Sequence, residues 1–400
     1  MRDRLIQNIK GNLLSACRRM HLAGIVTLAA AAAVLSGCER KPELHLNYDG
    51  DVVIDLPIVE LELDIFWDYS AEIGVDYNWQ DEWYYGWDDT DIELFGEIGY
   101  TKPSVFQLRR YHTGDTPYGE HTSVLSDVVN GYTYTKAFDW GFWDLLAWNE
   151  VTTIDGVQSL RFDETTTLDY VTASTGQTMN AARYQSPKYT RSFYQPEALF
   201  SAYSQAMEIN KDLDGFVYDP DRNVWVRQLD MTLYPVTYIY LTQVIIHHNN
   251  GRITGVDGNA NLSGMARSVN LNTGVTGDDP ITVHYYVRFK QNCSKNGESV
   301  DIAGGRLLTF GMCNLNGSRA TESVDDGQRH YMDVNMQFNN GIDSTFVFDV
   351  TDQVRKRYKG GVLTVELDAD TIKIPRRKGG SGFDAVVKDF EDGGTHEFEM

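Results

Sequence analysis

The chain has 400 residues, 57 of them acidic and 35 basic, which gives a formal net charge of −22 at pH 7. A protein with this charge repels nucleic acid and anionic surfaces, so we expect no nucleic-acid partner. The length suits two domains of ordinary size, and four cysteines are too few for a disulfide scaffold.

The first residues have the three regions of an export signal. Basic residues precede a short apolar stretch at residues 22–35, and the small residues Ser36 and Gly37 close it. The stretch is shorter than the roughly 20 residues that a transmembrane helix needs. Cys38 follows Leu-Ser-Gly directly, as in bacterial lipoprotein signals, so we expect residues 1–37 to be removed and Cys38 to carry several acyl chains, a durable anchor. The alternative is an ordinary cleaved signal with a cysteine there by chance.

The rest of the chain has the pattern of strands rather than helices. Leu61, Leu63 and Ile65 alternate with acidic residues, as in a strand with one buried face. Apolar residues between 236 and 246 lead into Asn-Asn-Gly at residues 249–251, and Asn-Gly between two such runs indicates a hairpin. Further strands are expected at residues 281–290, 306–313, 331–338, 344–350 and 362–367.

One segment, residues 196–210, is expected to be helical. It has Pro at its start and apolar residues spaced as on one face of a helix, namely Leu199, Phe200, Tyr203, Ala206 and Met207. Sustained strand–helix alternation, long repeats and heptads are all missing from the sequence. We therefore predict an all-β protein of two β-sandwich domains in series, residues 38–215 and 216–375, with one short helix near their junction.

The sequence lacks the common catalytic motifs: it has no P-loop, no Gly-x-Ser-x-Gly, no His-Glu-x-x-His and no Cys-x-x-Cys. His247 and His248 are adjacent in an expected strand, where neighbouring side chains point to opposite faces, so the pair cannot readily chelate one ion. Cys293 and Cys313 allow two interpretations, a disulfide bridge or two buried thiols. We predict neither a cofactor nor an enzymatic activity.

One loop has the ligand spacing of a calcium site. Asn210, Asp212, Asp214 and Asp221 occupy positions 1, 3, 5 and 12 of a loop that has Gly215 at position 6. Asn at the first position and the shorter Asp at the last weaken the match. The alternative interpretation is an ordinary turn, which uses the same residue types.

Residues 66–100 are rich in aromatic and acidic side chains. Aromatic rings can stack on sugars and carboxylates can bind the hydroxyls beside them, which would make Trp79, Trp83 and Trp87 a glycan-binding platform. Apolar and polar residues do not alternate over residues 79–90, which indicates a loop inserted between strands. The preferred interpretation is that the aromatic side chains cap one end of a sandwich while the acidic ones face solvent.

Several segments together resemble one family. They are the lipidation signal, the strand at residues 59–67, the segment that begins Gln-Pro-Glu at residue 195, Ala-Asn-Leu-Ser-Gly-Met-Ala at 260–266, Phe-Asp-Val-Thr-Asp-Gln-Val at 348–354 and Ile-Lys-Ile-Pro at 372–375. These segments look like those of fimbrillin-family lipoproteins of Bacteroidia, the subunits of type V pili and related surface proteins. The resemblance implies two transthyretin-like β-sandwich domains, lipid anchoring in the outer membrane at the cell surface, assembly with pilin-like subunits by strand exchange, and no enzymatic activity.

Within that family, the positions of the arginines distinguish shaft subunits from anchor or accessory subunits. Structural pilins of the type V class are cut after an Arg in the N-terminal domain, which removes the lipid and the first strand and opens a groove for a donor strand. Here no Arg lies between Arg40 and Arg109. Cleavage at Arg40 would keep the first strand, and cleavage at Arg109 or Arg110 would remove much of the first domain. The chain therefore resembles an anchor or accessory subunit more than a shaft subunit; the alternative is a surface glycan-binding lipoprotein.

The C-terminal residues 376–400 are expected to be a flexible tail with a candidate donor strand. A Gly-rich spacer at residues 379–382 precedes residues 383–390, which are enough to add one strand to a sheet edge. The alternative is a disordered acidic tail.

If Cys38 carries the anchor, Cys38→Ala should move the protein from the membrane fraction to the soluble exported fraction, or leave the signal uncut. Fractionation followed by mass measurement of the N-terminal peptide tests this. A Cys38→Ala protein that stays in the membrane with its signal removed would contradict the lipoprotein interpretation.

Overall fold

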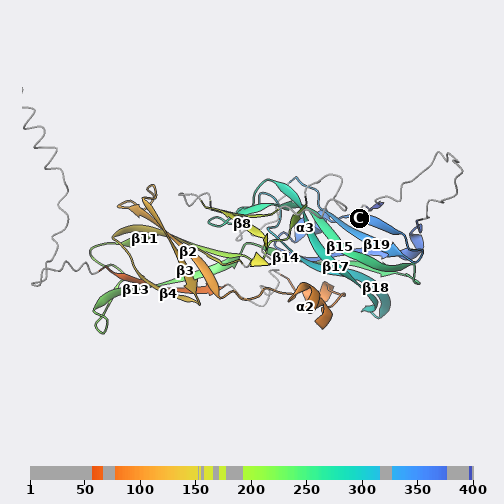
Figure 1. Cartoon of the computed structure of the whole chain (residues 1–400), viewed down its shortest axis with the longest axis horizontal. Helices are drawn as coiled ribbons and strands as arrows, with labels where there is room; N and C mark the ends of the chain where they lie inside the picture. Colours follow the sequence, from red (N-terminus) through yellow and green to blue (C-terminus); the bar gives the residue numbers. More distant parts are fainter. Residues whose placement is uncertain are drawn as a thin grey trace, which may run out of the picture. The chain divides into compact units, whose positions relative to one another are not determined.

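The computed structural model describes residues 56–65, 77–151, 153–154, 157–164, 171–176, 192–315, 327–375 and 396–398. These residues form two large curled sheets and two short helices (Figure 1). The prediction of a mainly β protein with two β domains is therefore confirmed. Cys38 and the candidate donor strand at residues 383–390 lie outside the described residues. Within the described part of the chain, every helix is too short or too polar to cross a membrane.

The first sheet has eight strands in the order β3-β2-β5-β11-β13-β1-β4, with β12 also paired to β13. Residues 226–233 of β13 pair with β1, whereas Tyr234 and Pro235 pair with β11, so β13 joins two layers. An apolar cluster with Leu61, Phe106 and Trp143 fills the space between them. The strands are β1 (Ile58–Ile65), β2 (Val105–Gly114), β3 (Ser123–Asn130), β4 (Thr133–Ala137), β5 (Gly141–Asn149), β11 (Phe200–Ile209), β12 (Val217–Asp219) and β13 (Val224–Pro235).

The second sheet has nine strands in the order β21-β14-β18-β17-β15-β19-β20-β22, with β10 paired to β17. Residues 280–286 of β17 pair with β15 and residues 287–295 pair with β18, so β17 joins the two layers around a second apolar cluster. The strands are β10 (Ser192–Tyr194), β14 (Tyr238–His247), β15 (Ile253–Ala266), β17 (Pro280–Lys295), β18 (Glu298–Thr309), β19 (Tyr331–Phe338), β20 (Asp343–Asp349), β21 (Gly361–Asp368) and β22 (His396–Phe398).

The remaining elements are short. A three-stranded sheet contains β8 (Leu160–Asp163), β9 (Thr172–Thr175) and β16 (Ser268–Asn270), and β6 (Thr153–Ile154) pairs with β7 (Val157–Gln158). The helices are α2 (Asp89–Phe95) and α3 (Thr351–Lys356), with 3-10 turns η2 (Trp79–Glu82) and η5 (Ala369–Thr371).

Most of the strands predicted from alternation are present, but the strand expected at residues 306–313 ends at Thr309, within β18. β1 matches the alternating run at residues 61–65, and β19 has the predicted bounds of 331–338. The turn at residues 249–251 joins β14 to β15, with Asn250 and Gly251 both at positive φ, as the Asn-Gly signal requires. β10 already pairs with β17 of the second sheet, and the chain leaves the first sheet finally between Pro235 and Tyr238, later than the expected division at residue 215. The domain boundaries themselves stay a prediction.

The helix predicted at residues 196–210 is wrong, because residues 200–209 form β11. A bulge between Ser204 and Met207 breaks the strand register, with Ala206 at a φ of 57°. Ala202 and Met207 therefore both reach the core although they are five residues apart, whereas residues an odd number apart face opposite sides of a regular strand. The buried Asp144 carboxylate accepts a hydrogen bond from the Ala206 amide at 2.7 Å and fixes the bulge. The bulge thus gives a strand the apolar spacing of a helix.

Candidate functional site

The first strand lies inside the first sheet rather than at its edge. β1 pairs in parallel with β13 along its whole length and antiparallel with β4 over residues 58–62. Its core-facing side chains are at most 3% exposed: Val59, Leu61, Leu63 and Ile65. Both edges of β1 are thus occupied, and its apolar face completes the core of the first sheet.

The two arginines that follow β1 in the sequence are buried in the same sheet. Arg109 and Arg110 lie in β2, whose backbone pairs with β3 on one side and with β5 on the other. Arg109 binds Glu164 at 2.7 Å, and Arg110 binds Asp127 at 2.9 Å. The two arginines are only 9% and 7% exposed. Because proteases cut exposed, unpaired segments, the native fold protects the bonds after both arginines.

Residues 77–100, which we call the aromatic strap, lie between β1 and β2 in sequence but pack on the second sheet. The strap contains η2 and α2, and it contacts β14, β17, β18 and β21. In Figure 1, α2, drawn in orange, lies beside strands of the second sheet, which are drawn in green to blue. A segment inserted between strands was predicted here, but its docking on the other sheet was not.

Gln243 of β14 holds the middle of the strap. Its side-chain oxygen accepts hydrogen bonds from the amides of Tyr84 at 3.0 Å and Tyr85 at 3.3 Å. Its nitrogen donates to the Glu82 carbonyl at 2.7 Å and to the Thr364 hydroxyl at 2.9 Å. Gln243 is fully buried, and this set of bonds satisfies its amide. Three of the four bonds join Gln243 to the strap, and the fourth joins it to β21.

A buried carboxylate fixes the start of α2. Asp91 is 0% exposed and forms a capping box with Asp88, in which each side chain accepts the other's backbone N–H. Arg288 and Lys290 of β17 bind Asp91 at 3.0 and 2.5 Å. The hydrogen bond from Lys290, together with those from the Asp91 amide and Arg288, holds the pKa of Asp88 well below its ordinary value. The two cations offset the burial of the Asp91 charge, and they tie α2 to the second sheet.

Tyr85 places its ring directly on the backbone of β18. A Cβ at Gly304 would lie 2.4 Å from a ring carbon of Tyr85, so only glycine leaves room for the ring. The Tyr85 hydroxyl donates to Asp91 at 2.8 Å, and the Lys290 ammonium lies 4.0 Å from the ring centroid. Burial, and then the hydrogen bond to Asp91, raises the pKa of Tyr85. The tyrosine therefore stays neutral and acts as an anchor of the strap.

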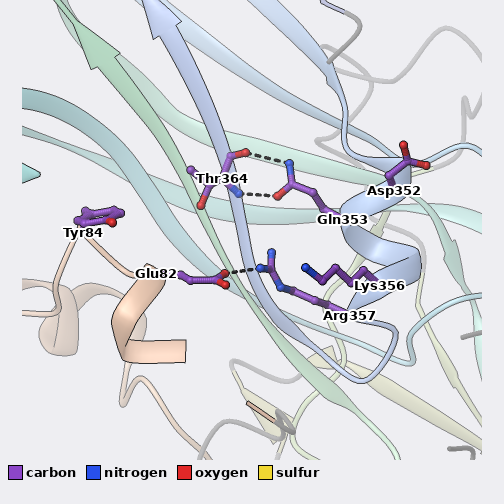
Figure 2. Close-up of a pocket in the computed structure, with 7 residues that line it drawn as sticks. All are labelled: Glu82, Tyr84, Asp352, Gln353, Lys356, Arg357 and Thr364. Atoms are coloured by element: carbon purple, nitrogen blue, oxygen red, sulfur yellow. Dashed lines mark hydrogen bonds and ion pairs between the residues drawn. The ribbon is translucent and has the colours of Figure 1, made fainter. Parts of the chain in front are cut away.

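A surface pocket of about 400 Å³ opens between the strap and α3 (Figure 2). Glu82 of the strap pairs with Arg357, and Gln353 makes two hydrogen bonds of 2.9 and 2.8 Å with the backbone of Thr364. The Thr364 hydroxyl is bound by Gln243. The pocket has a mainly charged and polar lining. It is lined by Glu82, Tyr84, Asp352, Gln353, Lys356, Arg357 and Thr364.

The three tryptophans proposed as a glycan platform are all half-buried in the strap. Trp79 packs against the apolar cluster that contains Leu61 of the first sheet and Val362 of the second. The indole N–H of Trp83 donates to the Gly86 carbonyl at 3.0 Å, and that of Trp87 donates to the Gly96 carbonyl at 3.1 Å. The indole donors of Trp83 and Trp87 are therefore used in hydrogen bonds within the strap, and part of each ring is buried. Glycan binding stays a prediction.

The candidate calcium loop adopts the hydrogen bonds of a turn. The Asn210 side-chain oxygen accepts from the amides of Asp212 at 3.1 Å and Asp214 at 3.4 Å. Asp221 donates its amide to Asp219 in the separate turn after β12. Calcium binding stays a prediction. Cys313 lies in an apolar cluster with Trp148 and Phe310, whereas Cys293 packs against the cluster of Tyr85 and Ile245. A bridge between the two cysteines stays a prediction.

No family model and no curated protein matches the sequence. The structure is similar to solved structures of Bacteroidetes adhesin candidates and fimbrial proteins. A candidate adhesin from Bacteroides ovatus is 13% identical, with a TM-score of 0.45, over 85% of this chain and 99% of the other. The fimbrial anchor protein Mfa2 from Porphyromonas gingivalis is 10% identical, with a TM-score of 0.35, over 78% and 90%. A fimbrial assembly protein from Parabacteroides distasonis is 9% identical, with a TM-score of 0.32, over 79% and 92%.

Truncating a core-facing side chain of β1 should destabilise the first sheet strongly. Leu61→Ala should lower the free energy of unfolding by about 2–5 kcal/mol, because it removes buried methyl groups and leaves a cavity. Glu62→Ala changes the exposed neighbour in the same strand and should cost no more than about 0.5 kcal/mol. Denaturant unfolding measures both, and equal effects would show that β1 is not packed in the core.

Gly304→Ala should displace Tyr85 and loosen the strap, at a cost of about 1–3 kcal/mol for overpacking. Gly255→Ala is the matched control, because the nearest atom to its Cβ would be the Gln337 side-chain oxygen at 3.4 Å. Hydrogen exchange of residues 77–100 should become faster in Gly304→Ala and stay unchanged in Gly255→Ala. Unchanged exchange in both proteins would contradict the docking of Tyr85 on β18.

Proposed function

We propose that the chain is a non-enzymatic, lipid-anchored outer-membrane protein that serves as the anchor or an accessory subunit of a surface pilus, or of a related adhesion assembly. Its partners would be pilin-like subunits, joined by strand exchange. The resemblance of its sequence segments to fimbrillin-family lipoproteins supports this proposal, and the transthyretin-like topology of the two domains is part of it. The lipid on Cys38 is the proposed link to the membrane.

The choice of an anchor role rests on the features that favour retention of β1. A subunit in the shaft must lose its first strand to receive a donor strand from the next subunit. Here no Arg lies between Arg40 and Arg109. Arg109 and Arg110 are buried in β2, with both backbone edges paired. Loss of β1 would also expose the apolar residues that Val59, Leu61 and Ile65 cover. A subunit that keeps this strand ends a fibre instead of extending it.

The C-terminal region supports strand exchange from this chain to a partner. β22 already pairs in parallel with β20, at the edge of the second sheet. This pairing adds a strand from the residues after β21 to a sheet edge, which is the kind of pairing that donation to a partner requires. The segment at residues 383–390 is the proposed donor.

The proposal predicts where the protein is found and what its N-terminus is. Immunogold labelling of isolated surface fibres should place it at one end of each fibre, and the mature protein should begin at Cys38 and contain residues 58–65. Cells that lack the protein should shed fibres into the medium. Labelling along the whole shaft, or a mature chain that begins after β1, would contradict an anchor role. A positive glycan array with no fibre association would favour the glycan-binding alternative.

A further inference from the structure

One end of the second sheet gathers two imidazoles and four carboxylates. β14 and β21 run in parallel with His247 beside Asp368, so both strands bring polar side chains to the same edge. The ring centroids of His247 and His248 are 6.3 Å apart. The four carboxylates belong to Glu298, Glu366, Asp368 and Asp370.

His247 is fully engaged by two of these carboxylates. Its Nδ1 lies 3.1 Å from Glu298, and its Nε2 lies 3.0 Å from Glu366. Both ring nitrogens of His247 are therefore occupied by carboxylate partners. Moreover, the two glutamates sit on opposite sides of the ring and cannot share one ion with it.

His248 has a different environment. Its Nδ1 lies 3.2 Å from Asp368 Oδ1, and Asp370 completes a group whose three ligand atoms all lie within 4.8 Å of one another. The Asp370 amide donates to Asp368 Oδ1 at 3.0 Å, which holds the two aspartates in one turn. The His248 side chain is 59% exposed, so a hydrated ion can reach the group.

We propose that His248, Asp368 and Asp370 bind a first-row divalent transition metal ion such as Zn²⁺, with water completing its coordination. One imidazole nitrogen and two carboxylate oxygens suit such an ion, whereas calcium and magnesium prefer oxygen alone. Arg252 lies 3.4 Å from Asp370 Oδ1. Since a carboxylate has two oxygens, Asp370 can bind an ion and keep this contact. The ion ties the β14–β15 turn to the end of β21.

His248→Asn and His247→Asn form a matched pair for the test. His248 has a φ of 50°, in the left-handed region that Asn tolerates, so His248→Asn removes the imidazole and keeps the turn. Titration calorimetry of the purified full chain with Zn²⁺ should show one saturable site. His248→Asn and Asp370→Asn should each weaken the affinity at least about tenfold, since even outer-shell changes cost 10–100-fold. His247→Asn should leave the affinity within about threefold, because that ring is engaged by glutamates.

Thermal melting gives a second measurement. Zn²⁺ should raise the melting temperature of the wild-type chain and of His247→Asn, but not that of His248→Asn, because an ion held by the native state stabilises it. Calcium should not replace Zn²⁺ in this effect. The proposal is overturned if Zn²⁺ shows no saturable binding, or if His247→Asn and His248→Asn lose it equally. A stabilisation by calcium alone would also overturn it and would point to the loop at residues 210–221.

Discussion

The insertion of β1 between β13 and β4 is the constraint on which the first sheet depends. β1 supplies four apolar side chains to the core, each worth about 1.5–3 kcal/mol when fully buried. It also pairs with the backbone along one side of β13 and one side of β4. Because β13 pairs with β1 over residues 226–233, the first sheet closes only when residues far apart in the sequence meet. The same pairing explains why retention of β1 decides the proposed role.

The aromatic strap joins two strands of the first sheet in the sequence but packs on the second sheet. Gln243, Tyr85 and Asp91 fix it by side-chain hydrogen bonds and ion pairs rather than by strand pairing. Residues 238–246 of β14 are buried on both faces. On the outer face, Ile245 lies in a cluster with Tyr85 of the strap, and Ile239 and Leu241 lie in the cluster that also fills the first sheet. A strand that is buried on both faces is expected to have consecutive apolar residues rather than alternating ones. Val-Ile-Ile at residues 244–246 is such a run.

In this strongly acidic chain, individual carboxylates are paired with nearby cations. Inside, the buried carboxylate of Asp91 is offset by Arg288 and Lys290. At the surface, four carboxylates beside His247 and His248 are only partly offset, by Lys295 and Arg252. A site with surplus negative charge and an accessible imidazole is suited to a cation, which connects the overall composition to the metal site proposed for His248.

The sequence by itself determined the β class, the bounds of strands such as β19 and the β14–β15 turn, because alternation and Asn-Gly act over a few residues. It was misleading at β11, where the bulge at Ala206 gives a strand helical spacing. Only the tertiary structure decided which strands flank β1, that the strap docks on the second sheet, and that His248 meets Asp368 and Asp370. These contacts join residues that lie far apart in the sequence, such as Ile58 and Val226, Tyr84 and Gln243, and His248 and Asp368. Local spacing carries no information about such pairs, since their geometry depends on register and packing between distant strands.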